Sequence, residues 1–173
     1  MPTHLILDGY NLLSVGGRQS GQLESARERL LRELASYRHR KNHHITVVFD
    51  GWQQGHPSEQ REHRSGVQVI YSKRGERADQ VIQRLAREYG SDCAVVTSDH
   101  EIVNTVRAHG AFVMGAQEFA SKLRSSSIST GVVPHKELDT GEDVTPRRGP
   151  EKKGNPRKLP KSQRQRDRNL KRF

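Results

Sequence analysis

The feature of the sequence that most constrains the fold is a short, wholly apolar run that stops at a carboxylate. Leu5, Ile6 and Leu7 are followed directly by Asp8 and Gly9. Such a run is typical of a strand buried on both faces, as in a parallel sheet covered by helices. Asp8 then lies at the carboxyl end of a strand, where open α/β sheets bind their ligands. An Asp-Gly pair is also a common turn, so this stretch alone leaves a turn and a functional edge equally open.

Four further apolar runs alternate with helical patterns along the chain. The runs that predict strands cover residues 45–49, 67–71, 93–97 and 111–114. Apolar residues recur with helical spacing over residues 22–39, 78–89, 102–106 and 119–123, and the third of these helices is expected to follow Ser98 and to end at about residue 109. This spacing predicts amphipathic helices. Strands that alternate with helices predict right-handed crossovers, and therefore a three-layer α/β/α sandwich around a parallel five-stranded sheet.

A polar stretch, residues 51–66, separates the second and third predicted strands. It is longer than most connections, so we expect either a functional loop or a loop with a short helix of its own. It holds the only tryptophan, Trp52, which either stacks on a base or packs on the body of the domain. Five histidines show no zinc-ligand spacing and are expected on the surface: His39, His43, His44, His56 and His63.

Charge is distributed very unevenly along the 173 residues. The formal net charge is +10; residues 146–173 hold twelve Lys or Arg and two acids, whereas residues 1–145 hold eighteen of each sign. The basic stretch has few large apolar residues and four prolines, so we expect it to be disordered. The predicted organisation is a folded domain over residues 1–124, a linker over 125–145 and a disordered polybasic tail over 146–173.

The beginning of the chain and its cysteine content predict a cytoplasmic protein. The first apolar run is interrupted at once by Asp8, so no signal peptide is expected. No apolar run approaches the roughly 20 residues that span a bilayer, which predicts no membrane contact. The single cysteine, Cys93, lies in an apolar run and has no partner for an intramolecular disulfide. The oligomeric state is not predicted.

Carboxylates close three of the predicted strands, at Asp8, Asp50 and Asp99. Asp79 lies in the first turn of the helix that follows the third strand, and a crossover helix starts near the carboxyl end of the strand before it. Parallel strands present their carboxyl ends on one edge of the sheet. We therefore expect Asp8, Asp79 and Asp99 to converge on that edge.

Ser98 and Glu101 form a capping-box pattern at the start of the helix after the fourth strand. With Ser98 as the cap, we expect Asp99 to face the edge of the sheet. Each acid also has a simpler explanation, as a turn residue, as a favourable charge at a helix start or as a helix cap. These explanations account for each acid singly, but not for the same feature at successive strand ends.

Carboxylates that are held close together repel one another unless a cation lies among them. Only oxygen ligands are available here, which favours Mg²⁺ or Mn²⁺ over zinc. Such an ion can neutralise a phosphodiester, lower the pKa of a water molecule and help the leaving oxygen depart. The set of acids therefore predicts a site for Mg²⁺ or Mn²⁺ that is suited to phosphodiester chemistry.

Four short motifs lie in order along the chain. They are Leu7-Asp8-Gly9-Tyr10-Asn11-Leu12, Val48-Phe49-Asp50-Gly51, Ala78-Asp79 with Ile82 following, and Thr97-Ser98-Asp99. In this order and spacing they resemble the bacterial YacP-like branch of the NYN domains, which are PIN-like ribonucleases. The resemblance covers residues 3–124. It implies a PIN-like fold with sheet order 3-2-1-4-5 and metal-dependent cleavage of single-stranded RNA.

The resemblance also implies roles for individual residues. The acids that would act as catalytic groups and metal ligands are Asp8, Asp79 and Asp99. Asn11 and Ser98 would orient ligands or phosphate. Apart from the resemblance, Arg74, Arg77 and Trp52 are predicted to bind substrate. Two further acids are added without an assigned role, Asp50 and Glu101. Residues 115–119 depart from the family pattern because they lack the serine expected at the start of the last helix.

The predicted function is a metal-dependent endoribonuclease acting on single-stranded RNA, including mRNA on or near the ribosome. The alternative is an RNA- or ribosome-binding protein on the same scaffold with weak or no catalysis. A haloacid-dehalogenase-like phosphatase is disfavoured because Tyr10 stands where a second aspartate is needed, and residues 9–12 lack the glycine-rich turn of a nucleotide-binding Rossmann domain. The basic tail either tethers the protein to RNA or the ribosome, or only solubilises it.

Overall fold

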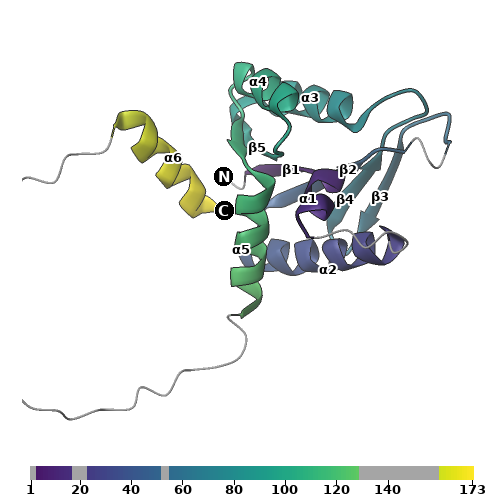
Figure 1. Cartoon of the computed structure of the whole chain (residues 1–173), viewed down its shortest axis with the longest axis horizontal. Helices are drawn as coiled ribbons and strands as arrows, with labels where there is room; N and C mark the ends of the chain where they lie inside the picture. Colours follow the sequence, from purple (N-terminus) through teal and green to yellow (C-terminus); the bar gives the residue numbers. More distant parts are fainter. Residues whose placement is uncertain (1–2, 17–22, 52–54, 129–159) are drawn as a thin grey trace, which may run out of the picture.

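The computed structural model describes residues 3–16, 23–51, 55–128 and 160–173. Figure 1 shows a sheet with helices on both faces and one further helix, α6, beside α5. Among the described residues, no helix is both long enough and apolar enough to cross a membrane.

The sheet has six strands in the order β3-β4-β2-β1-β5-β6. The strands are β1 (His4–Asp8), β2 (His44–Phe49), β3 (Gln60–Arg64), β4 (Val67–Tyr71), β5 (Cys93–Val96) and β6 (Phe112–Met114). Five of them are parallel, and β3 runs antiparallel to β4 at one edge. The strand that opens the chain, β1, is therefore central and pairs with both β2 and β5.

The helices cover both faces of this sheet (Figure 1). They are α1 (Gly9–Val15), α2 (Leu23–Lys41), α3 (Ala78–Tyr89), α4 (His100–Ala108), α5 (Ala116–Ile128) and α6 (Lys161–Arg172), with a 3₁₀ turn, η1 (Gly90–Asp92). Successive side chains along a strand point to opposite faces of the sheet, so β1 contributes to the apolar cluster on each face. Leu5 and Leu7 pack in one apolar cluster with Leu34 of α2, whereas Ile6 packs in a second cluster with Ile82 of α3.

The predicted order of the five parallel strands is confirmed, as β4-β2-β1-β5-β6. The prediction of a purely parallel five-stranded sheet is wrong, because β3 forms within the stretch expected to be a loop, residues 51–66. The sequence of β3, QREHR, contains no apolar residue and is largely exposed. Hydrophobic alternation therefore could not reveal it, and a charged edge strand of this kind resists pairing with other chains.

The prediction of disorder is wrong for the last part of the basic tail, because residues 161–172 form α6. Two apolar side chains anchor this helix: Leu170 packs against the core, and Phe173 is 4% exposed. The tail has too few apolar residues to form a core of its own, but docking onto an existing core needs only one or two. Residues 129–159, which include most of the predicted linker, lie outside the described residues, and α5 continues past residue 124 to Ile128.

Candidate active site at the carboxyl edge of the sheet

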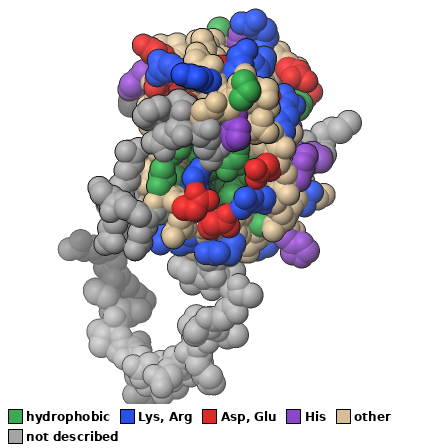
Figure 2. All heavy atoms as spheres, turned by 90° about the vertical axis from the view of Figure 1, so that its right-hand side faces the viewer, with side chains coloured by type: hydrophobic (Ala, Val, Ile, Leu, Met, Phe, Trp, Pro, Cys, Tyr) green, Lys and Arg blue, Asp and Glu red, His purple; other side chains and the backbone are tan. Residues whose placement is uncertain are grey.

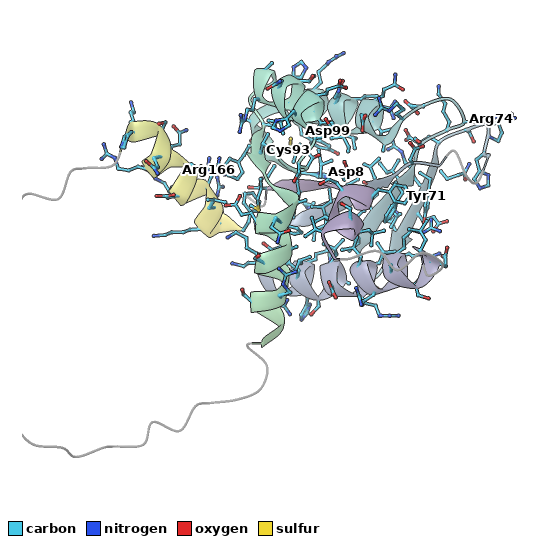
Figure 3. The ribbon with its side chains drawn as sticks, in the orientation of Figure 1. Asp8, Tyr71, Arg74, Cys93, Asp99 and Arg166 are labelled. Atoms are coloured by element: carbon cyan, nitrogen blue, oxygen red, sulfur yellow. The ribbon has the colours of Figure 1, made fainter. Side chains whose placement is uncertain are left out.

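Asp8 ends β1 and begins α1 as its N-cap. Its Oδ1 atom accepts a hydrogen bond from the main-chain N–H of Asn11 at 3.1 Å, and its Oδ2 atom accepts one from the hydroxyl of Thr97 at 3.4 Å. The side chain is nearly enclosed, since the residue is only 8% exposed. The turn explanation and the functional explanation therefore both hold: the carboxylate caps a helix and also lies at the edge of the sheet (Figure 3).

The electrostatics of Asp8 are unfavourable for its charged form. Burial raises the pKa of Asp8 to about 6, the hydrogen bond from Asn11 opposes this rise, and the nearby charges of Asp79 and Asp99 add to it. The three acids predicted to converge thus do lie close enough to influence one another. The site holds negative charge that the surrounding protein does not fully compensate.

Asp79 lies in the first turn of α3 and is partly buried. Its carboxylate pairs with the guanidinium of Arg77 at 2.7 Å. Burial raises the pKa of Asp79, Arg77 opposes the rise, and the charges of Asp99, Asp50 and Glu101 add to it in that order. The two additional acids named from the sequence therefore belong to the same electrostatic environment.

Asp99 is the N-cap of α4, and its Oδ1 atom accepts a hydrogen bond from the N–H of Glu101 at 2.8 Å. The predicted capping box is therefore wrong: Ser98 does not cap α4. Instead, the Ser98 hydroxyl accepts a hydrogen bond from the N–H of Ala116 at 3.1 Å, at the start of α5. The sequence pattern placed the helix start one residue too early, since α4 begins at His100 and the residue before it is the cap.

Asn11 connects α1 to the turn that follows β5. Its Oδ1 atom accepts a hydrogen bond from the N–H of Ser98 at 3.2 Å. The two residues predicted to orient ligands are thus in contact with each other, and each also has a structural task. Together they fix the distance between the Asp8 turn and the Asp99 turn.

Asp50 lies at the end of β2 and accepts a hydrogen bond from the hydroxyl of Ser72 at 3.2 Å. The Ser72 hydroxyl also accepts one from the N–H of Gly51 at 3.1 Å, which ties the ends of β2 and β4 together. A Cβ atom at Gly51 would lie 2.1 Å from the main-chain oxygen of Ser72, so only glycine fits. The second Asp-Gly pair therefore has a structural explanation, in which Asp50 and Gly51 join the ends of two strands.

The predicted substrate contacts are distributed around this edge. Arg74 and Arg77 are exposed in the segment between β4 and α3, and the main-chain N–H of Arg74 donates to the carbonyl of His56 at 2.9 Å. Trp52 lies outside the described residues. Figure 2 shows the face of the molecule on this side, where acidic and basic side chains lie next to one another around a hollow with hydrophobic side chains.

Two hydroxyls were missed by the sequence analysis. Thr97 is 1% exposed; its hydroxyl donates to Asp8 and accepts from the N–H of Asp99 at 3.1 Å. Ser72 plays the corresponding part for Asp50. A hydroxyl residue at or just after the end of an apolar strand is the signal that could have found both.

The acids meet the chemical requirement of a hard divalent cation, but they do not form a closed set of ligands. Within the described residues, no three His, Cys, Asp or Glu side chains are grouped so that they could together hold a metal ion. Mg²⁺ commonly binds through one or two carboxylates and keeps several waters, so it does not need such a group. The donors here are all oxygens, and the raised pKa of Asp8 shows that a cation would stabilise its charged form.

Comparison with known proteins defines the class to which this fold and site belong. The chain belongs to the YacP-like NYN domain family, whose model matches residues 5–164, and NYN domains are part of the PIN-like nuclease superfamily. The family predicted from the four motifs is thus confirmed. The match also continues beyond the residues 3–124 that the motifs covered, into the start of α6.

The relatives are proteins of Bacillus subtilis. The chain is 29% identical over 129 residues to the uncharacterized protein YacP of strain 168, covering 70% of this chain and 75% of the relative. It is similar to a crystal structure of Rae1 (YacP), with a TM-score of 0.58 and 25% identity over 73% of this chain and 76% of that one. A second crystal structure, of a mutant of Rae1, gives a TM-score of 0.59 and 27% identity over 75% and 79%.

Proposed function

We propose that this protein is a metal-dependent endoribonuclease that cleaves single-stranded RNA at the carboxyl edge of the sheet. The observation that carries the proposal is the state of Asp8, a nearly buried carboxylate whose pKa is raised to about 6 beside two other acids. Perturbed carboxylates of this kind are concentrated at functional sites. Membership of a nuclease superfamily supports the same conclusion.

The proposal assigns Asp8, Asp79 and Asp99 as the acids that would hold Mg²⁺ or Mn²⁺. When bound, such an ion supplies charge neutralisation and an activated water for phosphodiester hydrolysis. The chain itself supplies position: Thr97 holds one oxygen of Asp8, and the contact between Asn11 and Ser98 fixes the two turns relative to each other. Because ordinary neutral pH exceeds the pKa of Asp8, this carboxylate is mostly charged there and attracts a cation.

The proposed substrate contacts are cationic and flank the acids. Arg77 reaches Asp79 in the structure, so it is close to any phosphate that approaches this acid. Arg74 lies three residues earlier on the exposed segment. Bidentate guanidinium contacts suit phosphate oxygens. The proposal extends to mRNA on or near the ribosome, in the cytoplasm, as the source of the single-stranded substrate.

The second candidate function is an RNA- or ribosome-binding protein on the same scaffold with weak or no catalysis. The exposed cations beside the acids, Arg74 and Arg77, would serve such a protein as well as they would serve a nuclease. A ribonuclease should lose cleavage when the acids are substituted. A protein that only binds RNA should keep its RNA affinity in the same variants.

The test measures cleavage of single-stranded RNA with Mg²⁺, with Mn²⁺ and with a chelator. Wild type is compared with Asp8→Asn and Asp79→Asn, and with Asp92→Asn as a matched control, since Asp92 is an exposed acid of η1. We expect cleavage to require the metal and to fall roughly a thousandfold in the first two variants only. Cleavage that survives both substitutions, or that ignores the chelator, overturns the proposed mechanism. RNA binding without any cleavage by wild type establishes the second function.

A further inference from the structure

The most elaborate polar site outside the acidic edge is the place where α6 meets the body of the protein. Three side chains donate hydrogen bonds to main-chain oxygens at the end of this helix. Lys122 donates to Leu170 at 2.7 Å, His43 Nε2 donates to Arg172 at 3.0 Å, and the Tyr37 hydroxyl donates to Phe173. The last carbonyls of a helix lack partners within it, so these contacts satisfy them and place a cation at the negative end of the dipole.

An aromatic slot completes the docking site. The ring of Phe173 stacks on that of Phe112 with centroids 5.9 Å apart and an interplanar angle of 4°, and the ring of His43 lies 5.1 Å away. His43 is 8% exposed, so the prediction that it lies on the surface is wrong. Arg166 pairs with Glu118 of α5 at 3.5 Å. The helix is therefore held in a defined orientation by contacts from α2, β6 and α5.

Docking uses one face of α6 and leaves a second face pointing away. The residues that contact or pack against the body include Arg166, Leu170 and Phe173, at positions i, i+4 and i+7. On the opposite side, four exposed cations fall at i, i+3, i+7 and i+10. They are Lys161, Arg164, Arg168 and Lys171, and we call this set the α6 stripe. At 100° per residue the centres of the two sets lie nearly 180° apart.

The chemistry of the α6 stripe selects its partner. The sequence of α6, KSQRQRDRNLKR, has one acid and a single apolar residue, Leu170, which faces the core. A helix that lies on a membrane needs an apolar face, and here that face is already used by docking. Protein interfaces are anchored by buried aromatic or aliphatic groups, which the stripe does not offer. Four aligned cations suit a phosphate backbone, and they outnumber the one acid beside them, Asp167.

The distance between the α6 stripe and the acids limits which RNAs can contact both sites at once. α6 docks at the amino edge of the sheet, beside the starts of β2 and β6, whereas the acids lie at the carboxyl edge (Figures 1 and 3). The two edges are separated by the length of β1, five residues, or at least about 13 Å. The path around the surface is longer, so an RNA of a few nucleotides occupies one edge only.

We propose that the α6 stripe is a second RNA-binding surface, held rigid by the docking of Phe173, which binds the phosphate backbone of a long or folded RNA at a distance from the acids. The binding part of this proposal stands without catalysis. The part concerning cleavage rests on the proposed ribonuclease function. The last turn of α2 contains Arg40 and Lys41, three and four residues after Tyr37, and adds positive charge to the same edge.

The test compares two variants with the same formal net charge. The stripe variant carries Lys161→Gln, Arg164→Gln, Arg168→Gln and Lys171→Gln. The control carries Arg29→Gln, Arg32→Gln, Arg87→Gln and Arg107→Gln, four exposed cations of other helices. Each variant lowers the charge from +10 to +6. Binding to an RNA of about 40 nucleotides is measured by fluorescence anisotropy over a range of salt, with a chelator present so that no cleavage occurs.

The stripe variant is expected to bind the long RNA about tenfold more weakly and to lower the slope of log affinity against log salt by roughly 2 to 3, since each phosphate contact to a single strand contributes about 0.7. The control should change affinity less than about twofold. Equal losses in both variants, or no loss in the stripe variant, overturn the proposal. So does a stripe variant that keeps its RNA affinity but no longer binds vesicles of anionic lipid.

Two further measurements separate the parts of the proposal. Phe173→Ala, which releases the helix while keeping its charges, should weaken binding of the long RNA; affinity equal to that of wild type overturns the requirement for docking. Cleavage of an RNA of about six nucleotides should be unchanged in the stripe variant, whereas cleavage of the long RNA should fall. If wild type cleaves neither RNA but the binding results are as expected, the ribonuclease function fails and the second RNA-binding surface stands.

Discussion

The two edges of the sheet treat their polar groups in opposite ways. At the carboxyl edge, Asp8 is enclosed beside two other acids, and its pKa rises to about 6 because its charge is poorly solvated. At the amino edge, Tyr37, His43 and Lys122 each donate to a main-chain oxygen of α6 or of the residue after it. The carboxyl edge retains a destabilised carboxylate beside other acids, whereas the amino edge uses three polar side chains to hold two segments of the chain together.

This difference distinguishes a site for a ligand from a site for the protein's own chain. Groups that serve folding are expected to find partners, because an unpaired buried polar group is costly. A carboxylate that stays destabilised after folding is better explained by a ligand that arrives later. Four substitutions test this difference between the two edges, and they are given in order of decreasing expected effect.

The largest effect is expected from Phe173→Ala at the amino edge. Loss of the buried ring from its slot against Phe112 should lower the free energy of unfolding by about 4 kcal/mol, as measured by urea denaturation. The neighbouring substitution Arg172→Ala removes an exposed side chain and should change stability by less than about 0.5 kcal/mol. Equal stability of the two variants would show that α6 does not dock in solution.

The second prediction concerns pH and the carboxyl edge. Between pH 4 and about 6 the folded protein holds the proton of Asp8 more tightly than the unfolded chain, so Asp8 lowers stability as the pH rises through this range. In metal-free protein, Asp8→Asn should therefore gain up to about 3 kcal/mol relative to wild type at pH 7 and nothing at pH 4. Asparagine keeps the N-cap.

His4 at the amino edge supplies the opposite control. Burial lowers the pKa of His4 to about 4, with a smaller effect from His44, so His4 removes stability as the pH falls from 6.5 toward 4. Replacing it by His4→Gln should raise stability at low pH only. If the stability of Asp8→Asn depends on pH in the same way as that of wild type, the charged form of Asp8 is not destabilised at the carboxyl edge.

The third prediction concerns the glycine after Asp8. A Cβ atom at Gly9 would lie 2.3 Å from the ring of Phe49, so Gly9→Ala must displace a buried aromatic residue. We expect a loss of about 2 kcal/mol in thermal or urea unfolding. Gly115→Ala, where nothing lies within 4 Å of the new methyl group, should be neutral or slightly stabilising. Similar results for both would show that the turn after β1 can relax.

The smallest effect is expected from Ser98→Ala. The Ser98 hydroxyl accepts from the N–H of Ala116, so its removal should cost about 1 kcal/mol of stability through loss of a helix cap. Ser121→Ala is the matched control, because that hydroxyl donates to Gln117 and accepts from Arg124 on the exposed face of the same helix, α5, and caps no helix. If Ser98→Ala leaves stability unchanged but lowers cleavage, Ser98 contacts substrate and its capping role is secondary.

Much of the carboxyl edge was predictable because its causes are local. The run from Leu5 to Leu7 predicts a buried strand. Because strands alternate with helices, β1 and β5 are predicted to be parallel, with their carboxyl ends on the same edge of the sheet. The convergence of Asp8, Asp79 and Asp99 follows from that topology. The exact cap of α4 did not follow, because Ser98 and Asp99 are both good caps and only the contact with Ala116 decides between them.

The outermost strand and the amino edge could not be predicted in the same way. β3 has no apolar pattern, and its pairing with β4 is a tertiary contact. α6 is too polar to fold by burial of its own residues, and the ring of Phe173 fits between His43 and Phe112, which lie far apart in sequence. The five parallel strands follow from their apolar runs, and the edge on which Asp8, Asp79 and Asp99 lie follows from the topology of the chain, whereas the order of the strands followed from the resemblance to NYN domains. Only the tertiary structure decided where the basic end of the chain lies, because that depends on a surface that exists only after the rest has folded.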